Sequence, residues 1–357
     1  MQIAVACGGT GGHIFPGLST AQELVRRGHA VTLWLAGRDV EADSVQGWSG
    51  PVVLLAARGL RGGWRSRFGA LASMGGTVRD AVKHMRGDRP DVVLAMGSYA
   101  SVGPGLAARW LGIPLVLHEG NAVPGRAVQA LAPFAVRIGT GFADTGGRLP
   151  RSKTVYCGFP VRDDLAKQDR KPCDPPLLLV TGGSQGAAIL NRVVPEAVRA
   201  LASLGARFRV MHLAGRRAFG EVQERYRGLE HMVVVEAFSC RMPALYATAS
   251  LAITRAGAAT CTELALARLP AVLIPFAAAP GNHQWHNAQA VARGGGFRVL
   301  AEADCTPEVV TALLHEYLEN PSTLQHMQAA LPGGMLPDGA RRLADLVEGA
   351  SIKGALK

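Results

Sequence analysis

A short apolar run that leads through a glycine loop into a helical pattern occurs twice in this chain of 357 residues. The first copy begins with residues 3–12, IAVACGGTGG, and the second with residues 177–187, LLLVTGGSQGA. Apolar runs of this length before helical spacing are typical of buried parallel strands. Similar runs lie at residues 31–35, 91–96, 115–118, 208–213, 232–236, 251–254 and 271–275. The repeated pattern predicts an α/β protein with two Rossmann-like parallel-sheet domains.

A polar stretch at residues 144–176, which contains GGRLPRSK and KQDRKPCDPP, separates the two copies. Proline, glycine and charge are typical of a border between domains. We therefore expect an N-terminal domain over residues 1–160 and a C-terminal domain over residues 161–336, with a helix at about 337–357 packed back on the first domain. Ligands bind outside the carboxyl ends of such strands, so both glycine loops are expected to line a cleft between the domains.

The formal net charge of +11 calls for an anionic partner, which could be nucleic acid, an acidic membrane surface or a phosphorylated substrate. Aromatic residues make up only 6% of the chain and no nucleic-acid-binding signature is present, so we expect no nucleic-acid partner. The six cysteines lie far apart without a C-x-x-C pair, which favours reduced thiols over disulfides or zinc. No apolar run reaches the roughly 18 residues of a membrane span, so a cytoplasmic protein is expected.

The glycine loops match neither of the two common phosphate-binding motifs. If Gly9 and Gly11 are the first two glycines of the dinucleotide fingerprint G-x-G-x-x-G, Ile14 stands at the third position. Neither loop is followed by the Gly-Lys-Ser/Thr of a P-loop. Each loop can still present backbone N–H groups and the positive end of a helix dipole to a ligand. A purely structural turn is the alternative for either loop taken alone.

Several polar residues in the second half are candidate ligand contacts. Ser184 can donate its hydroxyl to a phosphate, or it can be a plain N-cap. Glu263, in the first turns after RAGAAT, could accept both hydroxyls of a ribose, although spacing alone favours a simple charge at a helix N-terminus. His283, Gln284 and Asn287 lie where PFAAAPGNHQWHN enters a helix, and amide side chains suit sugar hydroxyls because they both donate and accept.

Residues 61–86 combine an apolar stripe with basic side chains at helical spacing. This pattern predicts a helix that binds an anionic membrane surface. The alternative is a helix packed on its own sheet and broken at Gly75–Gly76. The apolar stripe consists of Trp64, Phe68, Leu71, Met74, Val78, Val82 and Met85, and the basic residues are Arg61, Arg65, Arg67, Arg79, Lys83 and Arg86.

The motifs GGTGGH, GSYASVGPGLAARWLGIPLVLHEGN, GGSQGA, RAGAATCTE and HQWHNA, in this order and spacing, resemble the MurG family. The resemblance spans residue 3 to about residue 287 and continues more weakly to the C-terminus. Members of that family transfer N-acetylglucosamine (GlcNAc) from UDP-GlcNAc to lipid I, which gives lipid II in peptidoglycan synthesis. The resemblance implies the GT-B fold, with two Rossmann-like domains facing across a cleft, and an inverting hexosyltransferase that needs no cofactor.

The resemblance also assigns donor-binding residues. Ser184 and the amides of its loop would bind the diphosphate, together with Arg162. Glu263 would bind the ribose hydroxyls, and the backbone near Phe238 and Ser239 would bind uracil. Three further residues would surround the GlcNAc ring, namely Asn121, His283 and Gln284.

The N-terminal glycine loop would receive the acceptor. Its side of the site would be formed by Thr10, Gly11, Gly12, His13, Ser98 and Tyr99. An alcohol is a poor nucleophile, and an imidazole with an ordinary pKa near ~6.5 suits a general base at pH 7, so His13 is the predicted base. The alternative is that His13 only orients the acceptor or contacts its diphosphate. No Asp-x-Asp pair stands where a metal clamp would be needed, so we expect no metal.

The chain departs from the family pattern at a few positions. Gly120 stands where Gln is common, and Phe159 stands where Asn is common. Gly281–Asn282 replaces an acidic pair, and Cys240–Arg241 replaces Asp–Asp. These departures leave the nucleotide sugar open. The alternatives are a related GT-B glycolipid synthase, a UDP-sugar epimerase or a non-catalytic nucleotide-sugar sensor. The resemblance further implies peripheral attachment to the cytoplasmic face of the cell membrane and contact with other cell-wall synthesis proteins.

Overall fold

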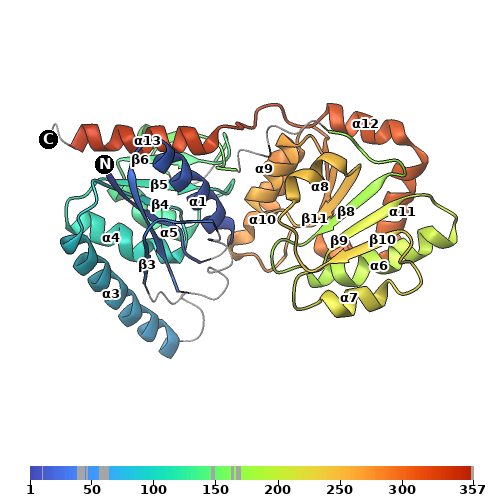
Figure 1. The fold of residues 1–357 in the computed structure, drawn as a ribbon, viewed down its shortest axis with the longest axis horizontal. Helices are drawn as coiled ribbons and strands as arrows, with labels where there is room; N and C mark the ends of the chain where they lie inside the picture. The colour runs from blue at the N-terminus through green and yellow to red at the C-terminus, as the bar shows by residue number, and fades with distance from the viewer. Residues whose placement is uncertain are drawn as a thin grey trace. The chain divides into compact units, whose positions relative to one another are not determined.

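The computed structural model describes residues 1–9, 11–37, 45, 47–55, 64–145, 149–161, 165 and 170–354, with only the backbone described at 64–73 and 352–354. The chain divides into two compact units. Unit 1 holds Met1–Arg162 and Leu336–Lys357, and unit 2 holds Asp163–Met335. Each unit is a parallel sheet with helices on both faces (Figure 1).

In the described part of unit 1, seven parallel strands form one sheet in the order β3-β2-β1-β4-β5-β6-β7. The strands are β1 (Gln2–Ala6), β2 (Ala30–Leu35), β3 (Val52–Leu54), β4 (Val92–Ala95), β5 (Leu115–Glu119), β6 (Arg137–Thr140) and β7 (Thr154–Tyr156). The helices are α1 (Gly11–Arg26), α3 (Trp64–Gly87), α4 (Val102–Trp110), α5 (Arg126–Leu131) and α13 (Gly339–Gly354). The strand order reverses between β1 and β4, which is the topological switch point of unit 1.

Alternate residues of the unit 1 strands face two different cores. Ile3 and Val5 of β1 lie in one cluster with α1 and α13, the latter through Leu343, Ala344, Val347 and Ala350. Ala4 and Ala6 lie in another cluster, with α3, α4 and α5. The last helix therefore completes the core of the unit that the first strand begins.

In the described part of unit 2, six parallel strands form a sheet in the order β10-β9-β8-β11-β12-β13. The strands are β8 (Leu177–Thr181), β9 (Arg209–Leu213), β10 (Val233–Glu236), β11 (Leu251–Thr254), β12 (Ala271–Leu273) and β13 (Phe297–Val299). The helices are α6 (Ala188–Ser203), α7 (Phe219–Arg225), α8 (Met242–Thr248), α9 (Ala258–Leu266), α10 (His283–Ala292), α11 (Pro307–Glu319) and α12 (Pro321–Ala329). The switch point lies between β8 and β11.

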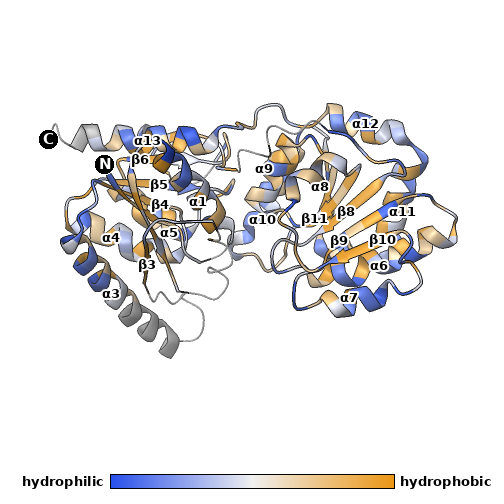
Figure 2. Ribbon diagram, viewed as in Figure 1, coloured by the Kyte–Doolittle hydropathy of each residue, from blue (hydrophilic) through white to orange (hydrophobic). Residues whose placement is uncertain are grey.

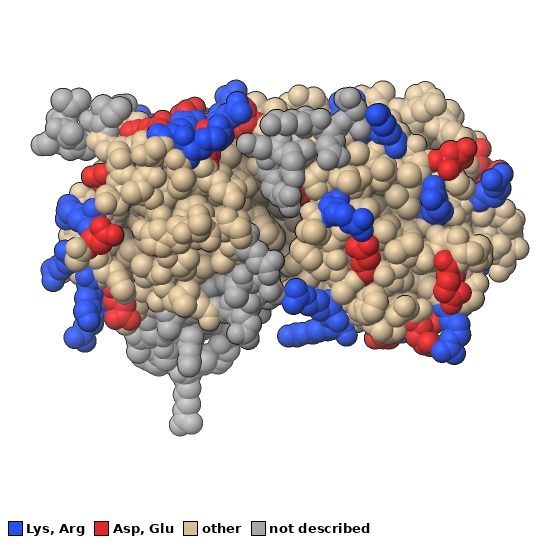
Figure 3. Space-filling model, in the orientation of Figure 1, with Lys and Arg blue, Asp and Glu red and all other residues tan. Residues whose placement is uncertain are grey.

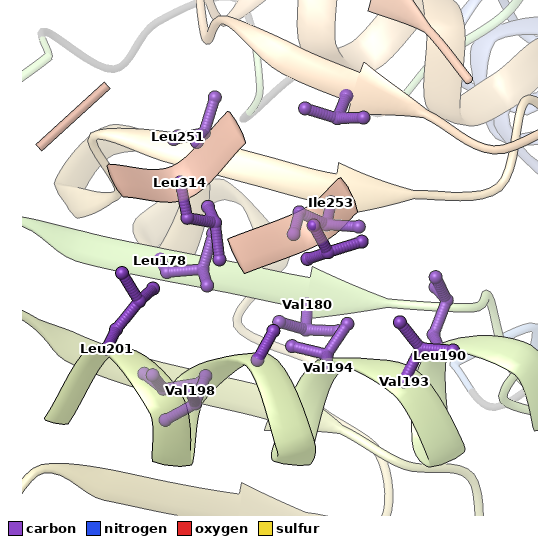
Figure 4. Close-up of a cluster of buried hydrophobic side chains, with 14 of the residues drawn as sticks. Leu178, Val180, Leu190, Val193, Val194, Val198, Leu201, Leu251, Ile253 and Leu314 are labelled. Carbon is purple, nitrogen blue, oxygen red and sulfur yellow. The ribbon is translucent and has the colours of Figure 1, made fainter. Parts of the chain in front are cut away.

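The main core of unit 2 lies between its sheet and the helices α6 and α11. Leucine and valine side chains of α6 interdigitate with Leu178 and Val180 of β8 and with Leu251 and Ile253 of β11, and Leu314 of α11 closes the layer (Figure 4). The strands of both units are coloured mainly as hydrophobic, whereas helices such as α7, α12 and α13 carry many hydrophilic residues (Figure 2). These observations confirm the predicted class of two Rossmann-like parallel-sheet domains.

The helix after the first glycine loop begins earlier than its apolar spacing predicts. The spacing indicates a helix over residues 18–27, but α1 already begins at Gly11. Glycine is a poor helix former, so its presence hides the first turn from a propensity argument. As a result, GGH of GGTGGH is the first helical turn rather than part of an open loop.

The segment at residues 64–86 forms one uninterrupted helix, so the expected break at Gly75–Gly76 is absent. Ala81 and Met85 are fully buried in the core of unit 1, and Val82 packs against that core. The C-terminal part of the apolar stripe, at Val82 and Met85, therefore packs on unit 1 itself, as the alternative interpretation predicts. Arg79, Lys83 and Arg86 remain exposed, and the side chains of Trp64, Phe68 and Leu71 lie outside the described residues.

Candidate functional site

In unit 1, His13 lies at the switch point between β1 and β4. It is the third residue of α1, and its Nδ1 lies 2.7 Å from the carbonyl oxygen of Met96, which follows β4. A carbonyl can only accept, so Nδ1 carries the hydrogen and the lone pair of the neutral ring is on Nε2. The N-terminus of α1, with Gly11 and Gly12 as its first residues, brings backbone N–H groups and a positive helix dipole to the same place.

Ser98 fastens the loop after β4 to the first glycine loop. Its hydroxyl donates to the carbonyl oxygen of Gly8 at 2.5 Å and accepts from the Ala100 N–H at 3.1 Å. Gly9 has a φ of 120°, and a β-carbon there would lie 3.3 Å from Cβ of Ser98 and 3.4 Å from the Tyr99 ring. The predicted acceptor-side residues that the structure describes are thus brought together, with Ser98 bound to backbone groups on both sides.

Asn121 follows β5 and is held by the carboxylate of Glu119. One oxygen of Glu119 accepts from the backbone N–H of Asn121 at 2.9 Å and from its side-chain amide at 3.0 Å. The other oxygen accepts from the Gly125 N–H at 2.7 Å. Burial raises the pKa of Glu119, and these three donors oppose the rise. Glu119 therefore fixes the direction of the Asn121 side chain, a role that the sequence analysis did not assign to it.

The two unit 1 departures from the family pattern touch one another. A β-carbon at Gly120 would lie 2.7 Å from Cε2 of the buried Phe159 ring. The same ring packs edge-to-face on His118, with ring centroids 5.9 Å apart. Phe159 thus occupies the space that a side chain at position 120 would need, so a larger residue there would require this ring to move.

Burial lowers the pKa of His118 to about 4, so its ring is neutral in the folded protein at pH 7. The unfolded chain, with an ordinary histidine pKa near ~6.5, binds the proton first as the pH falls. The resulting stability is complete above pH ~6.5 and is lost progressively towards pH 4. We expect His118 alone to lower the free energy of unfolding by about 2 kcal/mol between pH 7 and pH 5.

Urea unfolding at pH 7 and pH 5 measures this loss. His118→Gln should reduce the pH dependence, whereas His286→Gln, which replaces an exposed ring, should not. An equal pH dependence in the wild type and in His118→Gln would contradict the assignment.

In unit 2, the second glycine loop is a tight turn at the end of β8. The N–H of Gly186 donates to the carbonyl oxygen of Gly183 at 3.0 Å, which leaves Ser184 and Gln185 exposed at the tip. Helix α6 begins only at Ala188, with Ala187 as its N-cap. The N-cap reading of Ser184 is therefore wrong. Its exposed hydroxyl stands beside the N-terminus of a 16-residue helix.

Glu263 lies in the second turn of α9, beyond the first turn in which a helix dipole acts strongly. One oxygen of its half-buried carboxylate accepts from the hydroxyl of Tyr246 on α8 at 2.9 Å. The pKa of Tyr246 is raised by burial and by this carboxylate. The spacing favoured a simple charge at the helix N-terminus. Glu263 instead lies one turn further on and is hydrogen-bonded to a buried tyrosine.

The segment after β10 carries Phe238, which is 48% exposed, and the buried Ser239. Two hydrogen bonds tie the end of β10 to β9, from the Ala214 N–H to Glu236 at 2.9 Å and from the Gly215 N–H to Ala237 at 3.0 Å. Arg241, one of the departures, pairs with Glu236 at 2.8 Å. The exposed Phe238 and the buried Ser239 thus follow directly on the end of β10, and their contact with uracil stays a prediction.

Gln284 holds two loops together at the start of α10. Its side-chain oxygen accepts from the N–H of Phe276 at 2.9 Å and of Ala256 at 3.3 Å. Because the oxygen of Gln284 already has two donors, its amino group is the part of the side chain that can contact a sugar. The predicted use of both amide groups on sugar hydroxyls is therefore not supported for the oxygen. His283 is held differently, with Nδ1 at 2.7 Å from the carbonyl oxygen of Pro280.

Arg255 and Glu302 stabilise the same two loops, and this pair was not among the residues predicted from the sequence. Arg255 is buried, pairs with Glu302 at 2.8 Å and lies over the Phe276 ring at 5.1 Å. The other oxygen of Glu302 accepts from the Ala277 N–H at 2.8 Å. The two residues are 47 positions apart, so no local spacing could have indicated the pair.

Two predicted site residues, Thr10 and Arg162, lie outside the described residues. Among the residues that the structure does describe, there is no group of three or more His, Cys, Asp or Glu side chains placed to hold a metal ion.

Comparison with known proteins agrees with this arrangement. Residues 3–140 match the glycosyltransferase family 28 N-terminal domain, and residues 177–343 match the corresponding C-terminal domain. The chain is 39% identical over 352 residues to the UDP-N-acetylglucosamine–N-acetylmuramyl-(pentapeptide) pyrophosphoryl-undecaprenol N-acetylglucosamine transferase of Pseudomonas paraeruginosa, covering 96% of this chain and 97% of the relative. It is 38% identical to the enzyme of the same name from Halorhodospira halophila, covering 97% of both. The crystal structure of Acinetobacter baumannii MurG superposes with a TM-score of 0.78 at 29% identity, covering 98% and 99%.

Two parallel-sheet units with a glycine turn at each switch point, matched by both family 28 domains in order, define the glycosyltransferase class. Within that class the chain belongs to the MurG family. The resemblance drawn from the sequence motifs is confirmed.

Proposed function

We propose that the chain transfers GlcNAc from UDP-GlcNAc to the C4 hydroxyl of MurNAc in undecaprenyl-pyrophosphoryl-MurNAc-pentapeptide (lipid I), which forms lipid II for peptidoglycan synthesis. The likeness to transferases of that named activity over 96% of the chain carries the proposal, because it includes both units and both glycine turns. Two further residues support the proposal, namely His13 at the switch point of unit 1 and Glu263 in unit 2.

In the proposed reaction, unit 1 binds the acceptor and His13 removes the proton of its C4 hydroxyl. The hydrogen bond from Nδ1 to Met96 directs the lone pair to Nε2, which is the nitrogen that would take the proton. The oxygen then attacks C1 of GlcNAc from the face opposite UDP, so the bond to the diphosphate breaks and the product is a β-linkage formed by inversion. In the alternative, His13 only positions the acceptor.

In unit 2, the leaving diphosphate is assigned to the turn that carries Ser184. Its negative charge would be stabilised by the Ser184 hydroxyl, by backbone N–H groups at the N-terminus of α6 and by Arg162. Glu263 would accept the ribose hydroxyls, and the segment at Phe238 and Ser239 would contact uracil. Asn121, His283 and the amino group of Gln284 are the candidates for contacts with the GlcNAc ring.

The test is a turnover assay with UDP-GlcNAc labelled in the sugar and three conditions: a lipid I analogue, diacylglycerol, or no acceptor. Label in a β-linked disaccharide lipid is the expected result. Label in a diacylglycerol product would favour a glycolipid synthase. Formation of UDP-ManNAc without acceptor would favour an epimerase, and binding of UDP-GlcNAc without any product would favour a sensor.

We also propose that unit 1 binds the anionic cytoplasmic leaflet as a peripheral protein. No helix in the described ranges is long and apolar enough to cross a membrane. Lys and Arg side chains gather along α3, interspersed with acidic ones (Figure 3). Trp110 is the last residue of the neighbouring helix α4 and is 76% exposed. Arg89, which follows α3, donates to the carbonyl oxygen of Leu111, the next residue after Trp110, at 2.9 Å. An exposed indole beside basic side chains suits a membrane interface.

Replacing Trp110 with serine is expected to weaken binding to vesicles of phosphatidylglycerol and phosphatidylcholine roughly tenfold, since the buried area of an aromatic ring is lost. Folding should be unaffected because the side chain is exposed. Val25→Ser is a matched control, because Val25 is 47% exposed on α1, which belongs to the opposite helix layer of unit 1. Co-sedimentation at increasing salt measures both variants. Binding that ignores salt and anionic lipid content would contradict the proposal.

A further inference from the structure

The turn that carries Ser184 rests directly on the end of strand β9. A β-carbon at Gly186 would overlap the carbonyl oxygen of Ala214, and a β-carbon at Gly215 would lie 2.5 Å from the carbonyl oxygen of Gln185. Both glycines also have positive φ angles, 72° and 84°. The backbones of the turn and of residues 214–215 are therefore in contact without any side chain between them, so the position of Ser184 depends on where the Ala214 carbonyl lies.

A chain of three buried side chains leads from helix α7 to that carbonyl. The amide nitrogen of Asn191 donates to the Ala214 oxygen at 2.9 Å. The amide oxygen of Asn191 lies 3.0 Å from Nε2 of His212, and Nδ1 of His212 lies 2.9 Å from the hydroxyl of Tyr226. Tyr226 follows the last residue of α7, His212 belongs to β9, and Asn191 belongs to the first turn of α6.

The Ala214 carbonyl fixes the direction of every hydrogen bond in the chain. Because this carbonyl only accepts, the Asn191 nitrogen faces it and the Asn191 oxygen must accept from His212. Nε2 of His212 therefore carries the hydrogen, and Nδ1 accepts from the Tyr226 hydroxyl. Burial lowers the pKa of His212 to about 3, so the ring stays neutral at physiological pH and keeps this pattern.

The polar chain lies inside the main apolar core of unit 2. The exposed fractions of Asn191, His212 and Tyr226 are 8%, 1% and 2%. Apolar side chains could fill such space without needing partners, whereas a buried polar group left without a partner destabilises the fold. A fully satisfied buried network instead specifies one arrangement of the groups it joins. The group at its end here is the backbone on which the Ser184 turn rests.

We propose that Asn191, His212 and Tyr226 are positioning residues that hold the Ser184 turn in the geometry that binds the diphosphate of the donor. The inference rests on the proposed function, in which this turn binds the diphosphate. The three residues touch no substrate themselves. They act through the Ala214 carbonyl and the contact between Gly186 and Gly215.

The test compares the affinity for UDP with the affinity for uridine, which lacks the diphosphate. Tyr226→Phe removes one hydroxyl and keeps the ring. It is expected to weaken UDP binding about three- to tenfold, because the turn is held less firmly once roughly one hydrogen bond of the chain is lost. Uridine binding should be unchanged. The KM for UDP-GlcNAc should rise while kcat and the KM for the acceptor change less. Asn191→Leu, which breaks the chain at the carbonyl, should act in the same direction.

Tyr317→Phe is the matched control, because Tyr317 is 5% exposed in the same core cluster but belongs to α11. It should leave the ratio of UDP to uridine affinity unchanged. A purely structural role of Tyr226 would lower the melting temperature without changing that ratio, and this result would overturn the inference.

Ser184→Glu separates this failure from a failure of the proposed function. A carboxylate at the tip of the turn should repel a diphosphate and spare uridine. If Ser184→Glu lowers UDP affinity and Tyr226→Phe does not, the positioning role is wrong and the turn still binds the diphosphate. If neither variant changes the ratio, the assignment of the diphosphate to this turn is wrong, and the inference falls with it.

Discussion

Replacement of His13 with alanine is expected to lower the turnover number by about 10²- to 10⁴-fold, the usual contribution of a general base. The affinity for UDP-GlcNAc should be unchanged, because His13 is assigned to the acceptor and not to the nucleotide sugar. Turnover should fall because His13 is oriented as a base: its Nδ1–H donates to the Met96 carbonyl, so Nε2 is the basic nitrogen of the ring. Steady-state kinetics with a lipid I analogue, together with calorimetric binding of UDP-GlcNAc, measures the two effects separately.

His13→Asn separates a base from a positioning group. Asparagine can still donate to the Met96 carbonyl but has no basic nitrogen, so it should be about as slow as alanine if His13 is the base. Near-normal turnover of His13→Asn would show that the hydrogen bond, and not proton removal, is what matters. His29→Gln is a suitable control, since His29 pairs with Glu348 at 2.8 Å on the α13 side of unit 1.

Replacement of Glu263 with alanine is expected to weaken UDP binding about 10²-fold, because two hydrogen bonds from ribose hydroxyls to a carboxylate would be lost. The discrimination between UDP and 2′-deoxy-UDP should fall in the same variant. Isothermal titration with both nucleotides measures this directly. Unchanged UDP affinity in Glu263→Ala would refute the ribose assignment.

The Tyr246 hydroxyl provides the control for a structural effect at Glu263. Tyr246→Phe removes the 2.9 Å hydrogen bond but leaves the carboxylate in place. It should lower the melting temperature slightly and leave the preference for UDP over the deoxy nucleotide intact. If Tyr246→Phe weakened UDP as much as Glu263→Ala, the carboxylate would be acting through α8 rather than on the ribose.

Apolar pattern predicts the fold of this chain well where strands are fully buried. The runs at residues 177–181 and 251–254 coincide with β8 and β11, since both faces of these strands meet helices and every position before the closing threonine is therefore apolar. The short strands β3, β6, β7 and β13 were missed because they have only three or four residues and partly exposed positions. The glycines at the start of α1 hid its first turn.

Candidate site residues can be located from the sequence as far as they follow strand ends and family motifs. Sequence motifs indicated the loops of His13, Ser184, Glu263 and Gln284. They could not indicate that Gln284 uses its oxygen on two backbone amides, because those amides come from other loops. The hydrogen-bonded set of Asn191, His212 and Tyr226 was equally hidden, since its members are 14 and 21 residues apart and form no local pattern. Such contacts depend on tertiary packing alone.

Unit 1 is assembled from both ends of the chain, and this affects the order of events during synthesis. The core cluster that contains Ile3 and Val5 also contains Leu343 and Val347, so it cannot close until residues near the C-terminus have left the ribosome. Unit 2, in contrast, is continuous from Asp163 to Met335, so its core needs no residue from outside that range. A growing chain that has not yet reached α13 therefore lacks part of the first core, whatever the state of the second unit. The closing of unit 1 is thus one of the last events in the folding of this chain.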